Sequence, residues 1–141
     1  MHHKIYQMER RNFIKNSGVA AASMGLAGLQ TSKGKSQMKN IFVHHVYFWL
    51  KEPGNAELVK KFETALKKLV SIESISSYHL GKPADTRRDV IDSSYHYSLL
   101  TIFADKKAHD IYQDHPVHDD FRKVAGELAA KVVVYDSVDM L

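Results

Sequence analysis

The sequence predicts an α+β fold in which a four-stranded antiparallel sheet carries helices on one face. Two observations lead to this prediction. Segments rich in β-branched and aromatic residues alternate with segments whose apolar residues recur at helical spacing. Their order along the chain is strand, helix, strand, strand, helix, strand. A chain of 141 residues has the length of about one domain.

The first half of the domain is expected to contain a strand, a helix and a second strand. Residues 39–51, KNIFVHHVYFWLK, lack glycine and proline and are apolar on both alternating faces, which favours a strand. Asn55 is expected to cap a helix whose apolar residues follow the three-and-four spacing of one buried stripe. Residues 74–83 then form a short strand, which a glycine and a proline end.

The second half of the domain begins after a charged loop. Residues 95–104 predict a third strand, again with apolar side chains on both faces. Asp105 is expected to cap a short helix that runs toward Gln113. Pro116 disfavours helical geometry in the residue before it and suits a first helical position, so a new helix begins there. With a last strand over residues 131–140, the order is that of a ferredoxin-like βαββαβ fold.

The second face of this sheet lacks a cover within the chain. The helical segments shelter one face, whereas the strands carry large apolar side chains on both. An uncovered apolar face of several hundred Å² is unusual on a soluble monomer. The simplest cover is a second copy of the chain, so we expect a homodimer with sheet packed on sheet, which forms a dimeric α/β barrel.

The net charge of +4 at pH 7 is concentrated at the start of the chain. The first 39 residues hold seven lysines and arginines against one acid, whereas the remainder holds 13 bases and 15 acids. The folded part therefore lacks the basic stripe that nucleic-acid binding requires, and no nucleic-acid partner is expected. The absence of cysteine excludes disulfides, thiolate nucleophiles and cysteine-ligated metals.

Residues 1–38 have the order of an export signal followed by a linker: a basic front, a weakly apolar run and a polar stretch. Arg10 and Arg11, followed by a large apolar pair and a lysine, resemble a twin-arginine signal. The apolar run over residues 18–29 is too short for a bilayer, which needs about 20 residues, so no membrane span is expected. We therefore expect a periplasmic or secreted bacterial protein whose domain is residues 39–141. A disordered basic tail is the alternative.

Four segments together resemble one known family. They are HHVYFWLK in the first strand, YHYSLLTIFAD in the third, YQDHPVHDDF at the helix joint and VVVYD in the last strand. The family is the dimeric α/β-barrel family called the stress-responsive A/B barrel or Dabb domain, and the resemblance covers roughly residues 40–137. It implies a small homodimer with no obligatory metal or cofactor. Plant members include polyketide cyclases that close an aromatic ring by intramolecular aldol condensation.

The resemblance also implies candidate site residues. In those cyclases the chemistry is assigned to a tyrosine and a histidine that flank the helix joint, here Tyr112 and His118. An aldol closure needs a base that removes a proton α to a carbonyl and a donor that stabilises the oxyanion, and we assign these roles to His118 and Tyr112 respectively. The predicted lining of the ligand pocket is His44, Phe48, Leu66, Tyr95 and Tyr97. At Leu66 and Tyr97 the sequence departs from the cyclases, which have a tyrosine and a histidine there.

The other histidines show no spacing that suggests a shared site. His45 lies on the strand face opposite His44, toward the expected dimer contact. Within the expected domain, the remaining three are His79, His96 and His109. A metal held by His44, His115 and His118 is conceivable, but no carboxylate pattern completes the set, so neither a metal nor a cofactor is expected.

Two readings of the joint remain open. In the first, a pocket holds a small, largely apolar organic molecule and supports cofactor-free proton-transfer or cyclase chemistry. In the second, the protein is a non-catalytic, stress-associated binding or structural protein. Under that reading His115 bonds a free helix-end amide, Tyr112 is a core aromatic residue and His118 lies at the surface beside Asp119.

Overall fold

The computed structural model describes residues 36–140, so all but the last few residues of the expected leader lie outside the described part. The elements are β1 (Phe42–Leu50), α1 (Ala56–Leu69), β2 (Ser77–Gly81), β3 (Tyr97–Phe103), α2 (Lys106–Gln113), α3 (Pro116–Leu128) and β4 (Ala129–Val138). The strands β1, β2 and β3 are shorter than expected by a few residues, and β4 begins and ends two residues earlier than expected. The order of the elements is as predicted.

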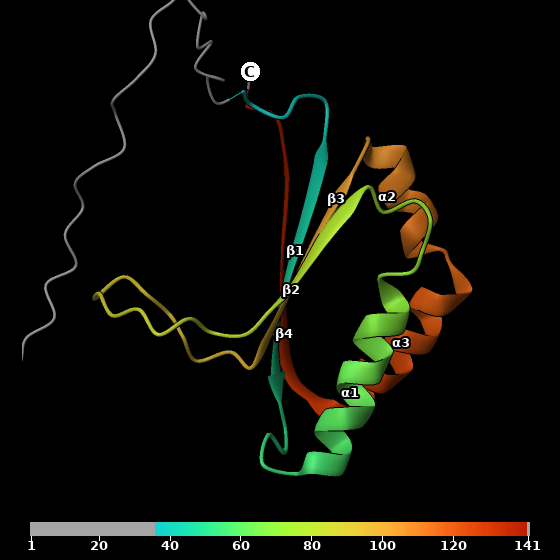
Figure 1. Ribbon diagram of the computed structural model, residues 1–141. Helices are drawn as coiled ribbons and strands as arrows, with labels where there is room; N and C mark the ends of the chain where they lie inside the picture. The colour runs from blue at the N-terminus through green and yellow to red at the C-terminus, as the bar shows by residue number, and fades with distance from the viewer. Residues whose placement is uncertain (1–35, 141) are drawn as a thin grey trace, which may run out of the picture. The chain divides into compact units, whose positions relative to one another are not determined.

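The four strands form one antiparallel sheet in the order β2-β3-β1-β4. The three helices all lie on one face of it (Figure 1). The predicted ferredoxin-like α+β fold is therefore confirmed, with the second helical connection divided into α2 and α3. Within residues 36–140, none of the helices combines the length and the apolar composition that a membrane span requires.

Helix α1 begins where its cap was predicted. The Asn55 side chain accepts hydrogen bonds from the backbone amides of Glu57 and Leu58 at 3.2 and 3.3 Å, which satisfies two of the free amides of the first turn. The buried stripe of the helix consists of Phe62, Leu66 and Leu69. Its lysines face away from the sheet and are mostly exposed.

The joint between α2 and α3 is also built from local capping. The Asp105 side chain accepts from the amide of Ala108 at 2.8 Å at the start of α2. The Nδ1 atom of His115 accepts from the amide of Val117 at 3.1 Å, and Pro116 is the first residue of α3. The expectation that His115 bonds a free helix-end amide is thus confirmed, and this role accounts for its position before the proline.

The core lies between the sheet and the helices. Along β1 the even-numbered residues are buried and the odd-numbered ones are partly exposed, as the period of a strand requires. The ring of Phe48 packs edge-on against Phe62 of α1 at 5.3 Å and against Phe121 of α3 at 5.7 Å between ring centroids. These aromatic contacts fix α1 and α3 over the centre of the sheet and leave its β4 edge uncovered.

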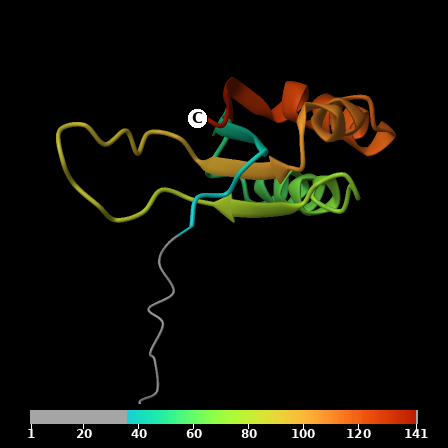
Figure 2. The ribbon, with the colours of Figure 1, turned by 90° about the horizontal axis from the view of Figure 1, so that it is seen from above.

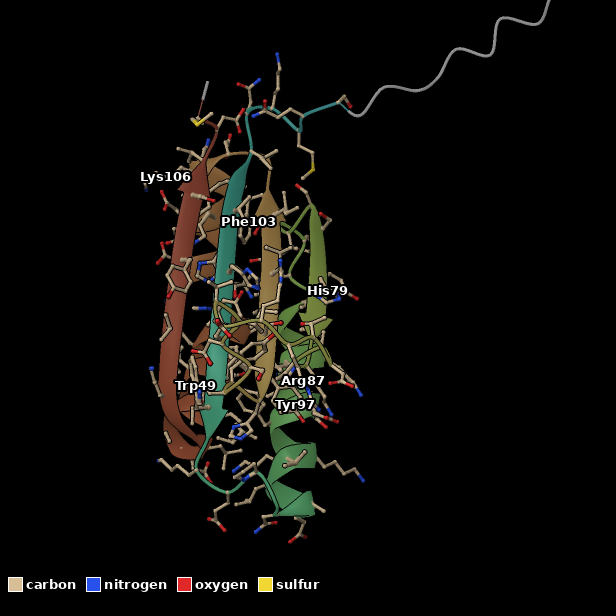
Figure 3. The ribbon with its side chains drawn as sticks, turned by 90° about the vertical axis from the view of Figure 1, so that its left-hand side faces the viewer. Trp49, His79, Arg87, Tyr97, Phe103 and Lys106 are labelled. Atoms are coloured by element: carbon tan, nitrogen blue, oxygen red, sulfur yellow. The ribbon has the colours of Figure 1, made fainter. Side chains whose placement is uncertain are left out.

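The other face of the sheet carries no helix, and we call it the open face. In β1 it presents the partly exposed side chains of Val43, His45, Tyr47 and Trp49. The loop of residues 82–96 between β2 and β3 extends away from the sheet on this side, opposite to the helices (Figures 1 and 2). Figure 3 shows Trp49 and His79 on the open face, with Arg87 in the loop that passes in front of it.

Candidate functional site

A groove of about 450 Å³ lies between the β1–β4 half of the sheet and α3. It exists because the small residues Ala125, Gly126, Ala129 and Ala130 border it, while β4 lies at the edge of the sheet beyond the cover of α1. Val132 and Val134 of β4 face the groove and remain 45% and 46% exposed. The groove is therefore largely apolar and accessible from the β4 edge.

Three polar side chains from different elements meet at this groove: His44 from β1, Tyr112 from α2 and His118 from α3. The rings of Tyr112 and His118 are 4.5 Å apart between centroids, and those of His44 and Tyr112 are 5.8 Å apart. All three residues are buried. The turn at Pro116 lets Tyr112 and His118 approach, since an uninterrupted helix would point residues six positions apart to different sides. His118 is not a surface residue beside Asp119.

Burial keeps both groups at the joint uncharged. Loss of solvation raises the pKa of the Tyr112 hydroxyl well above its ordinary value of 10.0, an effect that the nearby Arg122 guanidinium only partly offsets. Burial, with smaller contributions from Arg122 and His44, lowers the pKa of His118 from 6.5 to about 4. At neutral pH the groove therefore contains an uncharged tyrosine hydroxyl that keeps its proton and a neutral imidazole.

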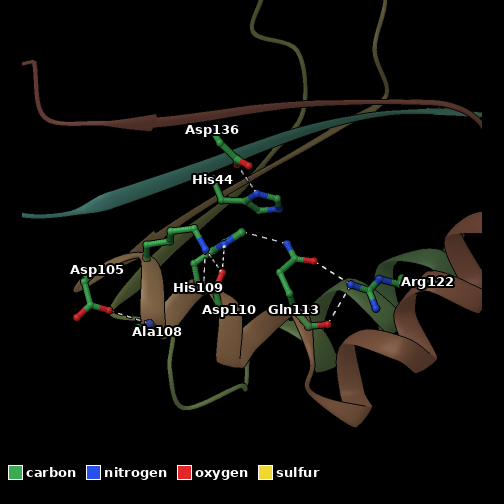
Figure 4. A network of polar contacts seen from close by, with 9 residues as sticks. His44, Asp105, Ala108, His109, Asp110, Gln113, Arg122 and Asp136 are labelled. Carbon is green, nitrogen blue, oxygen red and sulfur yellow. Dashed lines mark hydrogen bonds and ion pairs between the residues drawn. The ribbon is translucent and has the colours of Figure 1, made fainter.

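His44 is held by a carboxylate on the neighbouring strand. Its Nδ1–H donates to Oδ1 of Asp136 at 2.6 Å (Figure 4). Because a carboxylate only accepts, this bond places the proton on Nδ1 and leaves Nε2 of a neutral His44 with its lone pair. Asp136 thus sets both the tautomer and the orientation of the ring.

A second network runs along the α2–α3 joint. Arg122 Nη2 donates to the side-chain oxygen and the backbone carbonyl of Gln113 at 2.8 and 2.9 Å, and its Nη1 donates to Asp119 at 2.7 Å. The amide nitrogen of Gln113 lies 3.0 Å from Nε2 of His109 (Figure 4). Arg122 and Gln113 also line the groove, so this network fixes part of its wall.

The other residues that were predicted to line the pocket lie in three different places. Phe48 lines the groove with His44, Tyr112 and His118. Leu66 and Tyr97 instead line a second cavity of about 330 Å³ between α1 and β2, where the Tyr97 hydroxyl donates to Glu63 at 2.6 Å. Tyr95 lies on the open face, because β3 begins only at Tyr97 and the alternation of the strand does not extend back to it. Its ring is 4.8 Å from Tyr47 and 6.4 Å from Trp49.

Four residues of this region were missed from the sequence: His109, Gln113, Arg122 and Asp136. His109 was judged to share no site, yet its ring lies 5.0 Å from that of His44. Asp136 lies directly opposite His44 in the β1–β4 register. Only strand pairing, which links residues far apart in sequence, brings Asp136 to His44. The i, i+4 spacing of His109 and Gln113 is the one signal that the sequence offered.

Comparison with solved structures shows the same fold in other proteins. A Dabb family protein with a ferredoxin-like fold from Mesorhizobium loti is 28% identical, with a TM-score of 0.60 over 72% of this chain and 98% of that one. A dimeric ferredoxin-like protein of unknown function from Thermobifida fusca is 19% identical, with a TM-score of 0.58 over 75% and 97% of the two chains. The hydroxynitrile lyase of Passiflora edulis is 16% identical, with a TM-score of 0.60 over 74% and 98%.

At these identities the last two proteins show a likeness of fold alone. No curated protein matches the chain. The model of the Stress Responsive A/B Barrel Domain, Dabb, matches residues 42–139, which is most of the chain and includes every element described above. The protein therefore belongs to the Dabb family of stress-responsive A/B barrel domains.

Proposed function

We propose that the chain forms a homodimer whose groove binds a small, largely apolar and uncharged organic molecule and catalyses cofactor-free proton transfer on it. The observation that carries this proposal is the convergence of His44, Tyr112 and His118 on a groove that is otherwise mainly apolar. An apolar cavity with a few converging polar groups is the usual form of a small-molecule site.

The protonation states of Tyr112 and His118 suit them to different steps. His118, unprotonated at neutral pH, takes a proton from the carbon next to a carbonyl group, and the electron pair of the broken C–H bond moves onto the carbonyl oxygen. Tyr112 keeps its own proton and donates a hydrogen bond to that oxygen as it becomes negative. The resulting enolate then regains a proton at another position or attacks a second carbonyl of the same molecule.

The low pKa of His118 limits the substrate class. A base whose conjugate acid has a pKa of about 4 is weak, so it removes protons efficiently only from fairly acidic carbon atoms. Carbon atoms between two carbonyl groups meet this requirement. We therefore propose 1,3-dicarbonyl compounds with an apolar body as the substrate class. That the Passiflora edulis protein of the same fold is a hydroxynitrile lyase supports the view that this fold can carry an enzyme.

The homodimer is supported by the open face. Tyr47, Trp49 and Tyr135 form a cluster of aromatic rings there, and Tyr135 is 63% exposed in the single chain. Several proteins of the same fold are described as dimeric. Packing the open faces of two copies together would bury these rings, and the loops of residues 82–96 would reach the partner.

Export is supported by the sequence alone, since residues 1–35 lie outside the described part. We propose that the twin-arginine-like signal directs the folded protein to the periplasm or beyond. Replacing Arg10 and Arg11 with lysine in the native host should retain the protein in the cytoplasm, as measured by cell fractionation. Equal export of this double variant and the wild type would contradict the proposal.

The second candidate function is non-catalytic binding of the same class of molecule. It is favoured by the partial match to the cyclase pattern, since Leu66 and Tyr97 do not reach the groove. In that case the groove binds the molecule, and no carbon–hydrogen bond is broken.

A test that separates the two functions measures exchange of a carbon-bound proton. The purified dimer is mixed with a panel of apolar 1,3-dicarbonyl compounds in deuterated buffer, and loss of the proton signal between the carbonyls is followed by NMR. We expect faster exchange with the wild type and a loss of about 10²-fold or more of the acceleration in His118→Gln. Tyr112→Phe should lose about tenfold, because the hydrogen bond to the enolate is missing.

The matched control is Tyr78→Phe, which changes an exposed residue of β2 on the helical side of the sheet. This variant should exchange the probe as fast as the wild type. Binding without acceleration would support the non-catalytic function instead. Neither binding nor acceleration for any member of the panel would contradict the proposed substrate class.

A further inference from the structure

The cluster of His44, His109 and Asp136 has the composition of a metal site. One ring nitrogen of each histidine and one carboxylate oxygen of Asp136 lie within 4.8 Å of one another. The three residues come from β1, α2 and β4, so the fold itself brings them together. Figure 4 shows His44 between Asp136 above and His109 below.

His109 is held in place by its surroundings and has spare binding capacity. Its ring stacks on Phe42 at 4.3 Å and packs edge-on against Phe103 at 5.3 Å, and the residue is 8% exposed. Its Nδ1 is buried without a hydrogen-bond partner among the described residues, and Oδ1 of Asp110 lies 3.8 Å away. Its Nε2 accepts from the side-chain nitrogen of Gln113, because the oxygen of that amide already accepts from Arg122. A buried imidazole nitrogen without a partner is unusual and calls for one.

The spacing of the rings fits a shared ion. Two imidazoles bound to one ion at about 2.1 Å, with a roughly tetrahedral angle between them, have ring centroids about 5 Å apart. The centroids of His44 and His109 are 5.0 Å apart, with an angle of 50° between the ring planes. Asp136, whose side chain is 44% exposed, gives the cluster an entry from the β4 edge.

We propose that His44, His109 and Asp136 form a binding site for a divalent first-row transition metal ion, with Zn²⁺ as the representative. Two imidazoles and one carboxylate are donors that such ions prefer, whereas Mg²⁺ and Ca²⁺ require oxygen donors. On binding, the ion replaces the proton that His44 now shares with Asp136. Three protein ligands leave at least one coordination position for water or for a molecule in the groove, which His44 also lines.

The metal site does not depend on the proposed proton transfer. Tyr112 and His118 are not among its ligands, so a catalytic protein and a purely binding one would both hold the ion. Gln113, anchored by Arg122, is not a ligand; its hydrogen bond to Nε2 of His109 fixes the orientation of that ring in the metal-free protein.

The test uses the full chain without an added histidine tag, stripped with a chelator and dialysed into chelator-free buffer. Zn²⁺ alone is titrated by calorimetry, and Co²⁺ alone is titrated with its visible absorption as the readout of coordination geometry. We expect one ion per chain with a dissociation constant in the micromolar range or tighter. Asp136→Asn and His109→Gln should each weaken binding at least tenfold and alter the Co²⁺ spectrum.

Two controls identify adventitious binding. His79→Gln removes a histidine that lies near His45 on the open face, and His2→Gln with His3→Gln removes the pair near the start of the chain. Both should leave the titration unchanged. Since His109→Gln changes a buried residue, its thermal melt is compared with that of the wild type, and the more exposed Asp136→Asn serves as the second variant. No stoichiometric uptake, or uptake that depends on His79 or on His2 and His3 instead, would overturn the proposal.

Discussion

His44 and Asp136 face each other across the antiparallel pair of β1 and β4, and Nδ1–H of the histidine donates to the carboxylate at 2.6 Å. The pair joins the buried wall of the groove to the exposed edge of the sheet, because His44 is 5% exposed whereas the Asp136 side chain is 44% exposed. A change at the accessible edge therefore reaches one of the buried polar groups of the groove.

Asp136→Ala should release the His44 ring. In the metal-free wild type we expect a single His44 tautomer with the proton on Nδ1, and in the metal-free variant a mixture of both neutral tautomers. Nitrogen NMR of the imidazole distinguishes them. The lost charged hydrogen bond should also lower the free energy of unfolding by about 1–2 kcal/mol, measured with urea. Ser137→Ala, on the opposite face of the same strand, is the control, and an unchanged tautomer in Asp136→Ala would contradict the assigned role.

Acid should destabilise the protein through His118. Its folded pKa of about 4 lies below the ordinary value of 6.5, so protons bind the unfolded chain more readily. The stability that neutral His118 contributes is fully present above pH 6.5 and is lost as the pH falls toward 4. The loss should amount to at most about 3 kcal/mol.

The measurement is urea unfolding at a series of pH values. His118→Phe should flatten the dependence between pH 6.5 and 4, while some of it remains because burial also lowers the pKa of His109. The carboxylates titrate in both proteins and cancel in the comparison. A slope that is the same with and without His118 would show that the residue is not buried in its neutral form.

A charge on the open face should prevent dimerisation. Ile102 of β3 lies on that face and is partly exposed in the single chain, so a lysine there would be buried unpaired between the two sheets. Ile102→Lys should sediment as a monomer at micromolar concentration. Ile111→Lys is the matched control, since Ile111 is 53% exposed on α2 on the helical side. A dimeric Ile102→Lys protein would place the interface elsewhere.

Gly126 offers a stabilising substitution beside the groove. It lies within α3, and a Cβ atom built there meets nothing within 4 Å. Gly126→Ala should raise the free energy of unfolding by about 0.5–1 kcal/mol, because alanine loses less backbone entropy in a helix than glycine. Thermal unfolding at pH 7 measures the change. A lower melting temperature would mean that the groove wall needs the glycine.

The fold could be predicted from the sequence because its signals are local. The caps at Asn55 and Asp105, the break at Pro116 and the doubly apolar first strand each act over a few residues, and the structure retains them all. The contact of Tyr112 with His118 could be anticipated for the same reason, since both flank the proline.

The rest of the site depends on long-range geometry. Asp136 reaches His44 through the register of two strands 92 residues apart in sequence, and no local pattern specifies that register. Tyr95 was predicted to line the pocket but lies on the open face, because the strand begins two residues later than expected. Leu66 is buried as predicted, but α1 directs it toward the second cavity rather than the groove.

The central claim is that the groove beside Tyr112 and His118 holds an uncharged organic molecule, and native mass spectrometry of the protein purified from its own host tests it most directly. We predict a dimer that carries a co-purified small molecule, and we predict that Ala125→Phe, which fills the groove, abolishes this adduct while the dimer persists. A wild-type dimer without any adduct that also fails to bind neutral compounds from a fragment library, or an adduct that Ala125→Phe retains in full, would contradict the account.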